Sequence, residues 1–309
     1  MKVGFIGLGQ MGRGMASNLQ KAGFDLVVTE LTREVASVFL DGGAVWADTP
    51  REVAEACEVL FTSLPTPADV EAIAAGPDGL KAGLARGAAW FDLSTNAVDV
   101  VRRLQSELAT AGIDFLDAPV SGGPAGAASG DLAIWVGGDQ AAFDRHRKLL
   151  DAMSDKASYI GPIGAGTIAK LVHNMASAAV NAVVGEVLTM GVKAGLEPLP
   201  LWQAIRQGAA GRARMFDGVS KRFLQGKLDP PSFQLRLLHK DVGLALRLGG
   251  EVDVPMPLCD VVFEEITEAV QRGWGGRDAQ TYLLLQQERA EVPPFALTAE
   301  QVDAVLERT

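Results

Sequence analysis

The chain has 309 residues, of which 48% are hydrophobic and 21% charged, with a formal net charge of -10. This length favours two domains over one, and the composition predicts a globular protein with a real core. The negative charge disfavours non-specific binding to nucleic acid, because no basic stripe offsets it. Cys57, Cys259 and the three histidines show no disulfide or metal-ligand spacing, so we expect no metal site and a reducing compartment.

The start of the chain bears on localisation. A strand pattern begins at Lys2, which leaves no room for the charged and apolar regions of a signal peptide. No uncharged run of 18 residues follows, so we expect no association with a membrane. These features predict a cytoplasmic protein.

A strand, a glycine turn and a helix follow one another near the N-terminus. The apolar run 3–6 leads into Gly7-Leu8-Gly9-Gln10-Met11-Gly12, and a helical pattern continues to Gly23. In this context the first glycine of G-x-G-x-x-G makes a tight turn, the second admits a pyrophosphate, and the third lets the helix pack closely on the strand. The helix N-terminus then favours the bound anion.

A second strand pattern at 25–30 ends in Glu30, which lies 18 positions after Gly12. An acid at this point accepts hydrogen bonds from the adenosine ribose hydroxyls and repels a 2′-phosphate. We therefore predict NAD as the cofactor, with NADP as an alternative because Arg33 lies nearby. A solvated strand end is the other reading of Glu30, and a methyltransferase fits the glycine spacing and the acid less well.

Strand and helix patterns alternate through the first half of the chain. Further strands are predicted at 58–64, 88–93, 113–117 and 132–136, and helices at 51–56, 68–75, 98–111 and 140–153. This alternation predicts a Rossmann-type α/β domain, with a doubly wound, largely parallel sheet covered by helices on both faces. Ligands bind beyond the carboxyl ends of such strands, which makes the loop 63–67 and the pair Ser94-Thr95 candidates for the cofactor crevice.

The second half reads as helical only. Helices are predicted at 202–207, 215–224, 235–248, 258–272 and 297–308. We predict an NAD-binding domain at 1–162, an all-α domain at 163–292 that serves substrate binding and oligomerisation, and a C-terminal extension at 293–309. A long helix joins the first two.

That long helix follows a glycine-rich loop. Gly161, Gly164 and Gly166 precede a helical pattern with no proline before Pro198. Lys170 and Asn174 are four residues apart and therefore share one face near the helix start. Because the helix is apolar on most sides, we expect it to be buried, and polar groups on it then need partners or a site. A solvated lysine is the ordinary alternative.

Three more features suggest a binding role. The loop 117–130 contains four glycines, and N–H groups around Ser121, Gly122 and Gly123 can form a nest for a carboxylate, unless the loop is simply a flexible hairpin. Arg212 and Arg214 are glycine-flanked or nearly so, and we expect one of them to meet the far end of an anionic substrate unless both are solvated. Lys240 stands on an otherwise apolar helix, so we expect it to reach the crevice.

Four blocks of the chain resemble the β-hydroxyacid dehydrogenase family, whose members include 3-hydroxyisobutyrate dehydrogenase and tartronate semialdehyde reductase. The blocks are 7–19, 117–138, 161–174 and 240–245, in the order and spacing of that family. The resemblance implies that Ser121, Gly122 and Gly123 hold the substrate carboxylate, that Lys170 transfers the proton and that Asn174 orients the substrate. It also implies that Leu64, Pro65, Thr95 and Lys240 lie at the cofactor.

The chain departs from the family at two positions. Asn96-Ala97-Val98 lacks the proline often found just after the threonine, and Trp135 replaces a commoner methionine. The pair Gly211-Arg212 resembles one in 3-hydroxyisobutyrate dehydrogenases, but its neighbours differ.

We interpret the chain as an enzyme that transfers a hydride between NAD and a short, carboxylate-bearing β-hydroxy acid or its semialdehyde. One alternative is a reductase of other small aldehydes, such as succinic semialdehyde, tartronate semialdehyde or a sulfonated aldehyde. Another is a non-catalytic dinucleotide-binding module. The resemblance also implies a homodimer or homotetramer.

Overall fold

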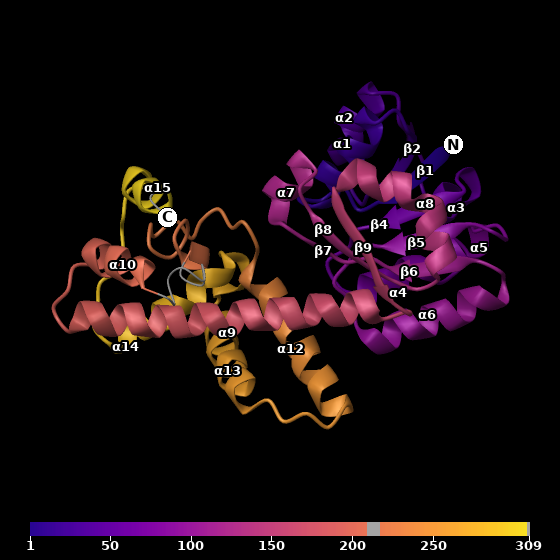
Figure 1. Ribbon diagram of the computed structural model, residues 1–309. Helices are drawn as coiled ribbons and strands as arrows, with labels where there is room; N and C mark the ends of the chain where they lie inside the picture. The colour runs from indigo at the N-terminus through magenta and orange to yellow at the C-terminus, as the bar shows by residue number, and fades with distance from the viewer. Residues whose placement is uncertain (209–216, 308–309) are drawn as a thin grey trace. The chain divides into compact units, whose positions relative to one another are not determined.

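The computed structural model describes residues 1–208 and 217–307, apart from the side chains at 186, 187 and 190. Two compact units make up the chain, Met1–Lys170 and Leu171–Thr309. The division falls within α9 (Ala165–Lys193), the long helix of Figure 1.

The first unit is built on one sheet. Its strand order is β3-β2-β1-β4-β5-β6-β8-β7, with β9 paired to β8. The strands are β1 (Lys2–Ile6), β2 (Asp25–Thr29), β3 (Val45–Trp46), β4 (Val59–Thr62), β5 (Ala89–Asp92), β6 (Asp114–Asp117), β7 (Val120–Ser121), β8 (Ala133–Gly137) and β9 (Lys156–Gly161). Neighbours from β3 through β6 are parallel, whereas β8 runs antiparallel to β6 and β7. The order reverses between β1 and β4, as in a doubly wound fold.

Helices connect these strands (Figure 1). They are α1 (Gly12–Lys21), α2 (Ser37–Asp41), α3 (Pro50–Ala56), α4 (Pro67–Ala74), α5 (Leu80–Gly83), α6 (Val98–Thr110), α7 (Gly123–Ser129) and α8 (Gln140–Met153). Local signals set several of these boundaries: the side chains of Thr49, Thr66 and Asp139 accept backbone N–H bonds at the N-termini of α3, α4 and α8. The predicted Rossmann-type α/β class is confirmed.

Aromatic rings form the centre of this sheet. Phe5, Phe61 and Phe91 are paired in register on β1, β4 and β5 and are fully buried. Their ring centroids lie 6.3 and 5.3 Å apart. Burying three phenylalanines in one row holds the carboxyl ends of the three strands at a common level.

Some sequence expectations for this unit are wrong. The segment 117–130 is not a single loop, because it contains the short strand β7 and the helix α7. The strands β3 and β9 were not predicted. β3 has only two residues, and β9 contains few strongly apolar side chains, so neither has a strong local signal.

The second unit is helical in its described part. Beyond α9 its helices are α10 (Pro198–Gln207), α12 (Leu235–Glu251), α13 (Pro257–Gln271), α14 (Leu284–Arg289) and α15 (Ala299–Leu306), with 3-10 turns at Asp217–Val219, Trp274–Gly276 and Ala279–Leu283. The predicted helix at 215–224 is wrong over its described residues, which form one 3-10 turn and further turns.

The C-terminal segment packs into this same unit. The ring of Phe295 meets Phe223 edge-on at 5.1 Å between centroids, and the Leu297 N–H donates to the Leu224 carbonyl at 2.8 Å. Within residues 1–208 and 217–307, no helix is long and apolar enough to cross a membrane.

The expectation that α9 is buried on most sides is wrong in part. Leu171, Met175 and Ala178 are buried, but Val172 and Val183 are 63% and 57% exposed. Their separation of 11 residues places them on one helix face. An apolar composition alone does not distinguish a buried helix from one that leaves an apolar face uncovered.

Candidate active site

The carboxyl ends of four strands lie in register. Ile6 pairs with Thr62, Thr62 with Asp92, and Asp92 with Asp117 across β1, β4, β5 and β6. Since parallel strands present their carboxyl ends at one edge, the loops that follow begin side by side. This edge brings together the predicted cofactor residues of the first unit: Gly7, Leu8, Gly9, Gln10, Met11, Gly12, Leu64, Pro65 and Thr95.

The three glycines of the first turn meet different steric conditions. Gly7 has φ +92°, and a Cβ there would lie 2.3 Å from the Ser63 carbonyl oxygen. A Cβ on Gly12 would lie 1.8 Å from the Gly7 carbonyl oxygen. At Gly9 a Cβ would meet no described atom within 4 Å, so open space faces the backbone.

The start of α1 fits a dinucleotide pyrophosphate. Among the described residues no side chain caps this helix, and its first turn carries no acid. The N–H groups of that turn are therefore not used by a capping side chain, and the space at Gly9 lets a phosphate approach them.

Glu30 is held beside the glycine turn. Its Oε2 accepts the Leu8 N–H at 2.6 Å and its Oε1 accepts the Leu31 N–H at 2.8 Å. A carboxylate has about four acceptor sites, so two backbone bonds leave capacity for ribose hydroxyls. The guanidinium of Arg33, the residue for which the sequence left NADP as an alternative, lies over the Trp46 ring at 5.3 Å from its centroid.

A buried carboxylate joins the loops after β4 and β5. Asp92 accepts from Thr62 Oγ1 at 2.9 Å, from Asn96 Nδ2 at 2.8 Å and from the Ser94 N–H at 3.2 Å. Ser94 Oγ in turn accepts the Leu64 N–H at 2.9 Å. Burial raises the pKa of Asp92 above its usual value, and the hydrogen bonds from Ser94, Asn96 and Thr62 offset part of that increase.

Asn96, where the chain departs from the family, takes part in two hydrogen bonds through its side chain. Besides donating to Asp92, the Asn96 side chain accepts the Ala97 N–H at 2.7 Å. These two bonds order the backbone next to Thr95 where no proline does so. Sequence reasoning missed Asp92 and Asn96, although a lone acid at the end of an apolar strand was a signal.

The predicted carboxylate-binding residues occupy a sharp turn. Ser121 ends β7, and Gly122 and Gly123 lead into α7 with φ of +137° and +65°. A Cβ on Gly122 would lie 2.9 Å from Leu132 Cδ2, whereas Gly123 has nothing within 4 Å among the described atoms. The segment is thus a strand, a turn that needs glycine, and a helix, not a flexible hairpin.

Lys170 and Asn174 both lie on α9, four residues apart. Lys170 is half-buried and Asn174 is buried. A spacing of four residues stacks their side chains on one helix face.

An acid in the second unit brings two predicted site residues together. Asn174 Nδ2 donates to Asp241 Oδ2 at 2.6 Å, and Lys240 Nζ lies 2.8 Å from Asp241 Oδ1. Asn174 Oδ1 is also 3.1 Å from His173 Nδ1. Asp241 is only 2% exposed, and the sequence offered a signal for it as an acid next to a lysine on an apolar helix.

Arg212 and Arg214 lie outside the described residues, so their predicted role is not addressed by the structure. Over the described part of the chain, no group of three or more His, Cys, Asp or Glu side chains could hold a metal ion.

Comparison with known proteins covers nearly the whole chain. Residues 2–161 match the family model for the NAD binding domain of 6-phosphogluconate dehydrogenase. Residues 164–285 match the model described as NAD-binding of NADP-dependent 3-hydroxyisobutyrate dehydrogenase. Both halves of the chain are therefore related to dehydrogenases that use NAD or NADP.

Individual relatives of the chain are also named as dehydrogenases. The chain is 33% identical over 278 residues to 2-(hydroxymethyl)glutarate dehydrogenase of Eubacterium barkeri, covering 90% of this chain and 92% of the relative. It is 36% identical over 261 residues to 3-hydroxyisobutyrate dehydrogenase of Pseudomonas aeruginosa, covering 83% and 88%. Among solved structures, Mycobacterium tuberculosis 3-hydroxyisobutyrate dehydrogenase with L-serine has a TM-score of 0.81 at 27% identity, covering 92% of this chain and 98% of that one.

The glycine turn with its acid, the sheet order and these matches agree with one another. The chain belongs to the β-hydroxyacid dehydrogenase family, whose enzymes oxidise CH–OH groups with NAD or NADP.

Proposed function

We propose that this enzyme transfers a hydride between NAD and a short β-hydroxy acid or its semialdehyde, in the manner of a 3-hydroxyisobutyrate dehydrogenase. The observation that carries the proposal is that Lys170 and Asn174 share one face of α9 and that the Asn174 amide donates to the buried Asp241. A module that only bound a dinucleotide would have no use for a lysine and a fixed amide at this position.

Lys170 is the proposed proton-transfer group. Bound NAD would supply the hydride acceptor for the hydroxyl-bearing carbon, and its reduced form would supply the hydride in the reverse reaction. In oxidation the neutral Lys170 amine takes the hydroxyl proton, and in reduction the ammonium supplies a proton to the carbonyl oxygen. Asn174 orients the substrate beside it.

The proposed substrate carries a carboxylate. Ser121, Gly122 and Gly123 hold that group at the turn before α7, and Arg212 meets the far end of the substrate. Two relatives support this chemistry, since one is named for 3-hydroxyisobutyrate and a solved structure contains L-serine, which is itself a β-hydroxy acid.

NAD is the proposed cofactor. The Glu30 carboxylate accepts the Leu8 N–H within the glycine turn, where it would oppose a 2′-phosphate. Leu64, Pro65, Thr95 and Lys240 are proposed to contact the cofactor as well. The second matching family model is described as NADP-dependent, so both cofactors belong in the test.

A substrate panel tests the proposal. The absorbance of reduced nicotinamide is followed with NAD and with NADP for the hydroxy acids 3-hydroxyisobutyrate, L-serine and 2-(hydroxymethyl)glutarate. It is followed with NADH and with NADPH for the aldehydes tartronate semialdehyde, succinic semialdehyde and a sulfonated aldehyde. We expect the highest kcat/KM with NAD and one of the short β-hydroxy acids. Turnover confined to the three aldehydes favours the alternative reductase, and no turnover at all favours a binding module.

Replacement of Lys170 tests its role. Lys170→Ala should leave NAD affinity, measured by fluorescence quenching, nearly intact while kcat falls by about 10²-fold or more. Lys170→Arg should not restore the rate, because a guanidinium stays protonated near neutral pH. Near wild-type turnover in Lys170→Ala contradicts proton transfer, and an equal loss of NAD affinity makes Lys170 a binding residue.

The remaining proposals concern organisation. We propose that residues 1–162 bind the cofactor, that 163–292 serve substrate binding and oligomerisation with 293–309 as an extension, and that the enzyme is a homodimer or homotetramer in the cytoplasm. Light scattering coupled to gel filtration measures the mass of the assembly directly.

A further inference from the structure

Asp117 bonds to the first turn of the helix that carries Lys170. The carboxylate sits at the end of β6, where its Oδ1 accepts the Gly164 N–H at 2.8 Å and its Oδ2 accepts the Thr167 N–H at 2.6 Å. Asp117 is 1% exposed, so these bonds form away from water. Both donors precede or begin α9 and have no intrahelical acceptor.

The backbones around this carboxylate approach so closely that only glycine fits. A Cβ on Gly137 would lie 2.5 Å from Asp117 Oδ1. A Cβ on Gly166 would lie 2.2 Å from the Trp135 carbonyl oxygen and 2.7 Å from that of Asp117. The ends of β6 and β8 and the start of α9 therefore pack closely, with little freedom to shift, and we call this contact the joint.

This joint lies between two groups of proposed site residues. Lys170 follows Thr167 by three residues, which is less than one helical turn. On the other side, Ser121 follows Asp117 by four residues through β7. A change in how the carboxylate holds the helix start is thus passed to both the lysine and the carboxylate-binding turn.

We propose that Asp117 is a positioning residue that sets the placement of the Lys170 amine relative to the turn at Ser121. The inference rests on the proposed function in that Lys170 and Ser121 are its site residues. Asp117 does not touch the reacting atoms. It acts through the two N–H bonds that fix the first turn of α9.

Asp139 provides a matched control. It caps α8 in the same unit by accepting the Ala142 N–H at 2.8 Å, but α8 carries no proposed site residue. Asp117→Asn should lower kcat about ten-fold or more and raise KM for the acid, because misplaced reacting groups cost rate. The Kd for NAD should not change, since the glycine turn follows β1 whereas Asp117 ends β6. Asp139→Asn should leave kcat, KM and Kd unchanged.

A second measurement does not depend on turnover. Labelling with acetic anhydride compares the reactivity of the Lys170 amine with that of the exposed Lys148 on α8. The ratio should change by about three-fold or more in Asp117→Asn and stay constant in Asp139→Asn, because amine reactivity follows its surroundings. If the wild type turns over no substrate of the panel, the proposed function fails while this ratio still tests Asp117.

A third variant covers the case in which Asp117→Asn does not fold. Thr167→Pro removes the N–H that bonds Asp117 Oδ2 in the first turn of α9, where no intrahelical hydrogen bond is lost, and Thr167→Ala keeps that N–H. Only the proline variant should change the labelling ratio and kcat. The proposal is overturned if the Asp117 and Thr167→Pro variants behave as their controls do.

Discussion

Asn174 Nδ2 donates to Asp241 Oδ2 at 2.6 Å, across 67 residues of sequence. Both side chains are buried, so the bond is shielded from water. An amide that donates to a carboxylate on one side must present its carbonyl oxygen on the other. Asp241 thereby fixes the orientation of the Asn174 amide, whose oxygen lies 3.1 Å from His173 Nδ1, and it also pairs with Lys240.

Asp241→Asn should destabilise the protein by about 1–3 kcal/mol, because it weakens the bond to Asn174 and leaves Lys240 without its carboxylate. The substrate KM should rise as the Asn174 amide loses its fixed orientation. Urea unfolding and steady-state kinetics measure the two effects. The control is Asp260→Asn, an exposed acid on α13, which should change stability by no more than about 0.5 kcal/mol. Equal behaviour of the two variants contradicts the prediction.

Glu30→Gln separates charge from hydrogen bonding. The glutamine oxygen can still accept the Leu8 N–H, but the negative charge that opposes a 2′-phosphate is gone. The ratio of kcat/KM for NAD over NADP should fall by about ten-fold, equivalent to roughly 1.4 kcal/mol. Glu30→Ala should also lower this ratio. It should weaken NAD binding as well, because Leu8 in the glycine turn loses its hydrogen-bond acceptor. A wild type that prefers NADP would sink this prediction.

The raised pKa of Asp117 predicts that the stability of the protein depends on pH. Burial raises the pKa of this carboxyl from 3.8 to about 6, although the N–H groups of Thr167 and Gly164 lower it. The native state therefore binds the proton more tightly than the unfolded chain, and ionisation opposes folding. The free energy of unfolding of the wild type should fall relative to Asp117→Asn as the pH rises from about 4 to about 6, and the difference should then level off. Urea titrations across this range measure it, and a constant difference contradicts the assignment.

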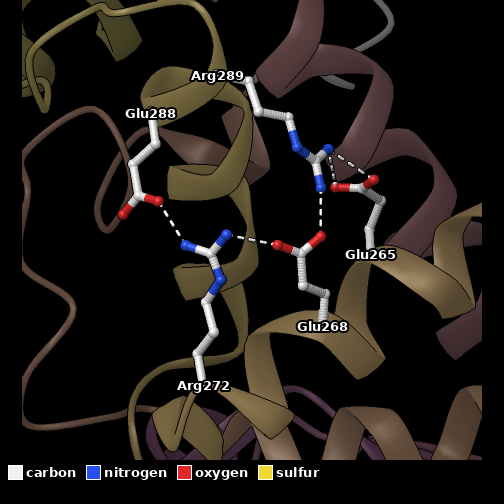
Figure 2. Close-up of polar contacts among 5 residues, drawn as sticks. All are labelled: Glu265, Glu268, Arg272, Glu288 and Arg289. Atoms are coloured by element: carbon white, nitrogen blue, oxygen red, sulfur yellow. Dashed lines mark hydrogen bonds and ion pairs between the residues drawn. The ribbon is translucent and has the colours of Figure 1, made fainter.

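Five charged side chains link α13, the turn after it and α14 (Figure 2). Arg272 pairs with Glu268 and Glu288, and Arg289 pairs with Glu265 and Glu268. Hydrogen bonding to Arg272 is the main cause that lowers the pKa of Glu268, with Arg289 adding to it. The stabilisation is thus present above the unfolded pKa of Glu268 and is lost as the pH falls through its folded value.

Glu268→Gln should lower Tm slightly at low ionic strength, because this carboxylate bridges both arginines. The difference from the wild type should shrink in 1 M salt, where such exposed pairs are screened. Glu264→Gln on the exposed side of α13 is the control and should leave Tm unchanged. A Tm decrease that persists in high salt would show that packing, not charge, is responsible.

Sequence by itself determined the features that have local causes. The glycine turn and Glu30 belong to a short motif whose residue types are required by φ and by close approach. In the structure a Cβ on Gly7 or Gly12 would clash with a backbone carbonyl oxygen, and Glu30 accepts the Leu8 N–H. The helix 140–153 was predicted with its observed bounds, because an Asp cap and an apolar periodicity mark it. The Rossmann-type class followed from the alternation of such local patterns.

Only the tertiary structure decided the features that depend on distant partners. The helix α7 contains two glycines and a proline, which disfavour a helix, and β7 is held by its pairing with β8. Asp92, Asp117 and Asp241 each have a partner 30 to 67 residues away, at strand ends and a helix face brought together by folding. A hydrogen bond between such residues leaves no spacing in the sequence, which is why these distant partners became visible only in three dimensions.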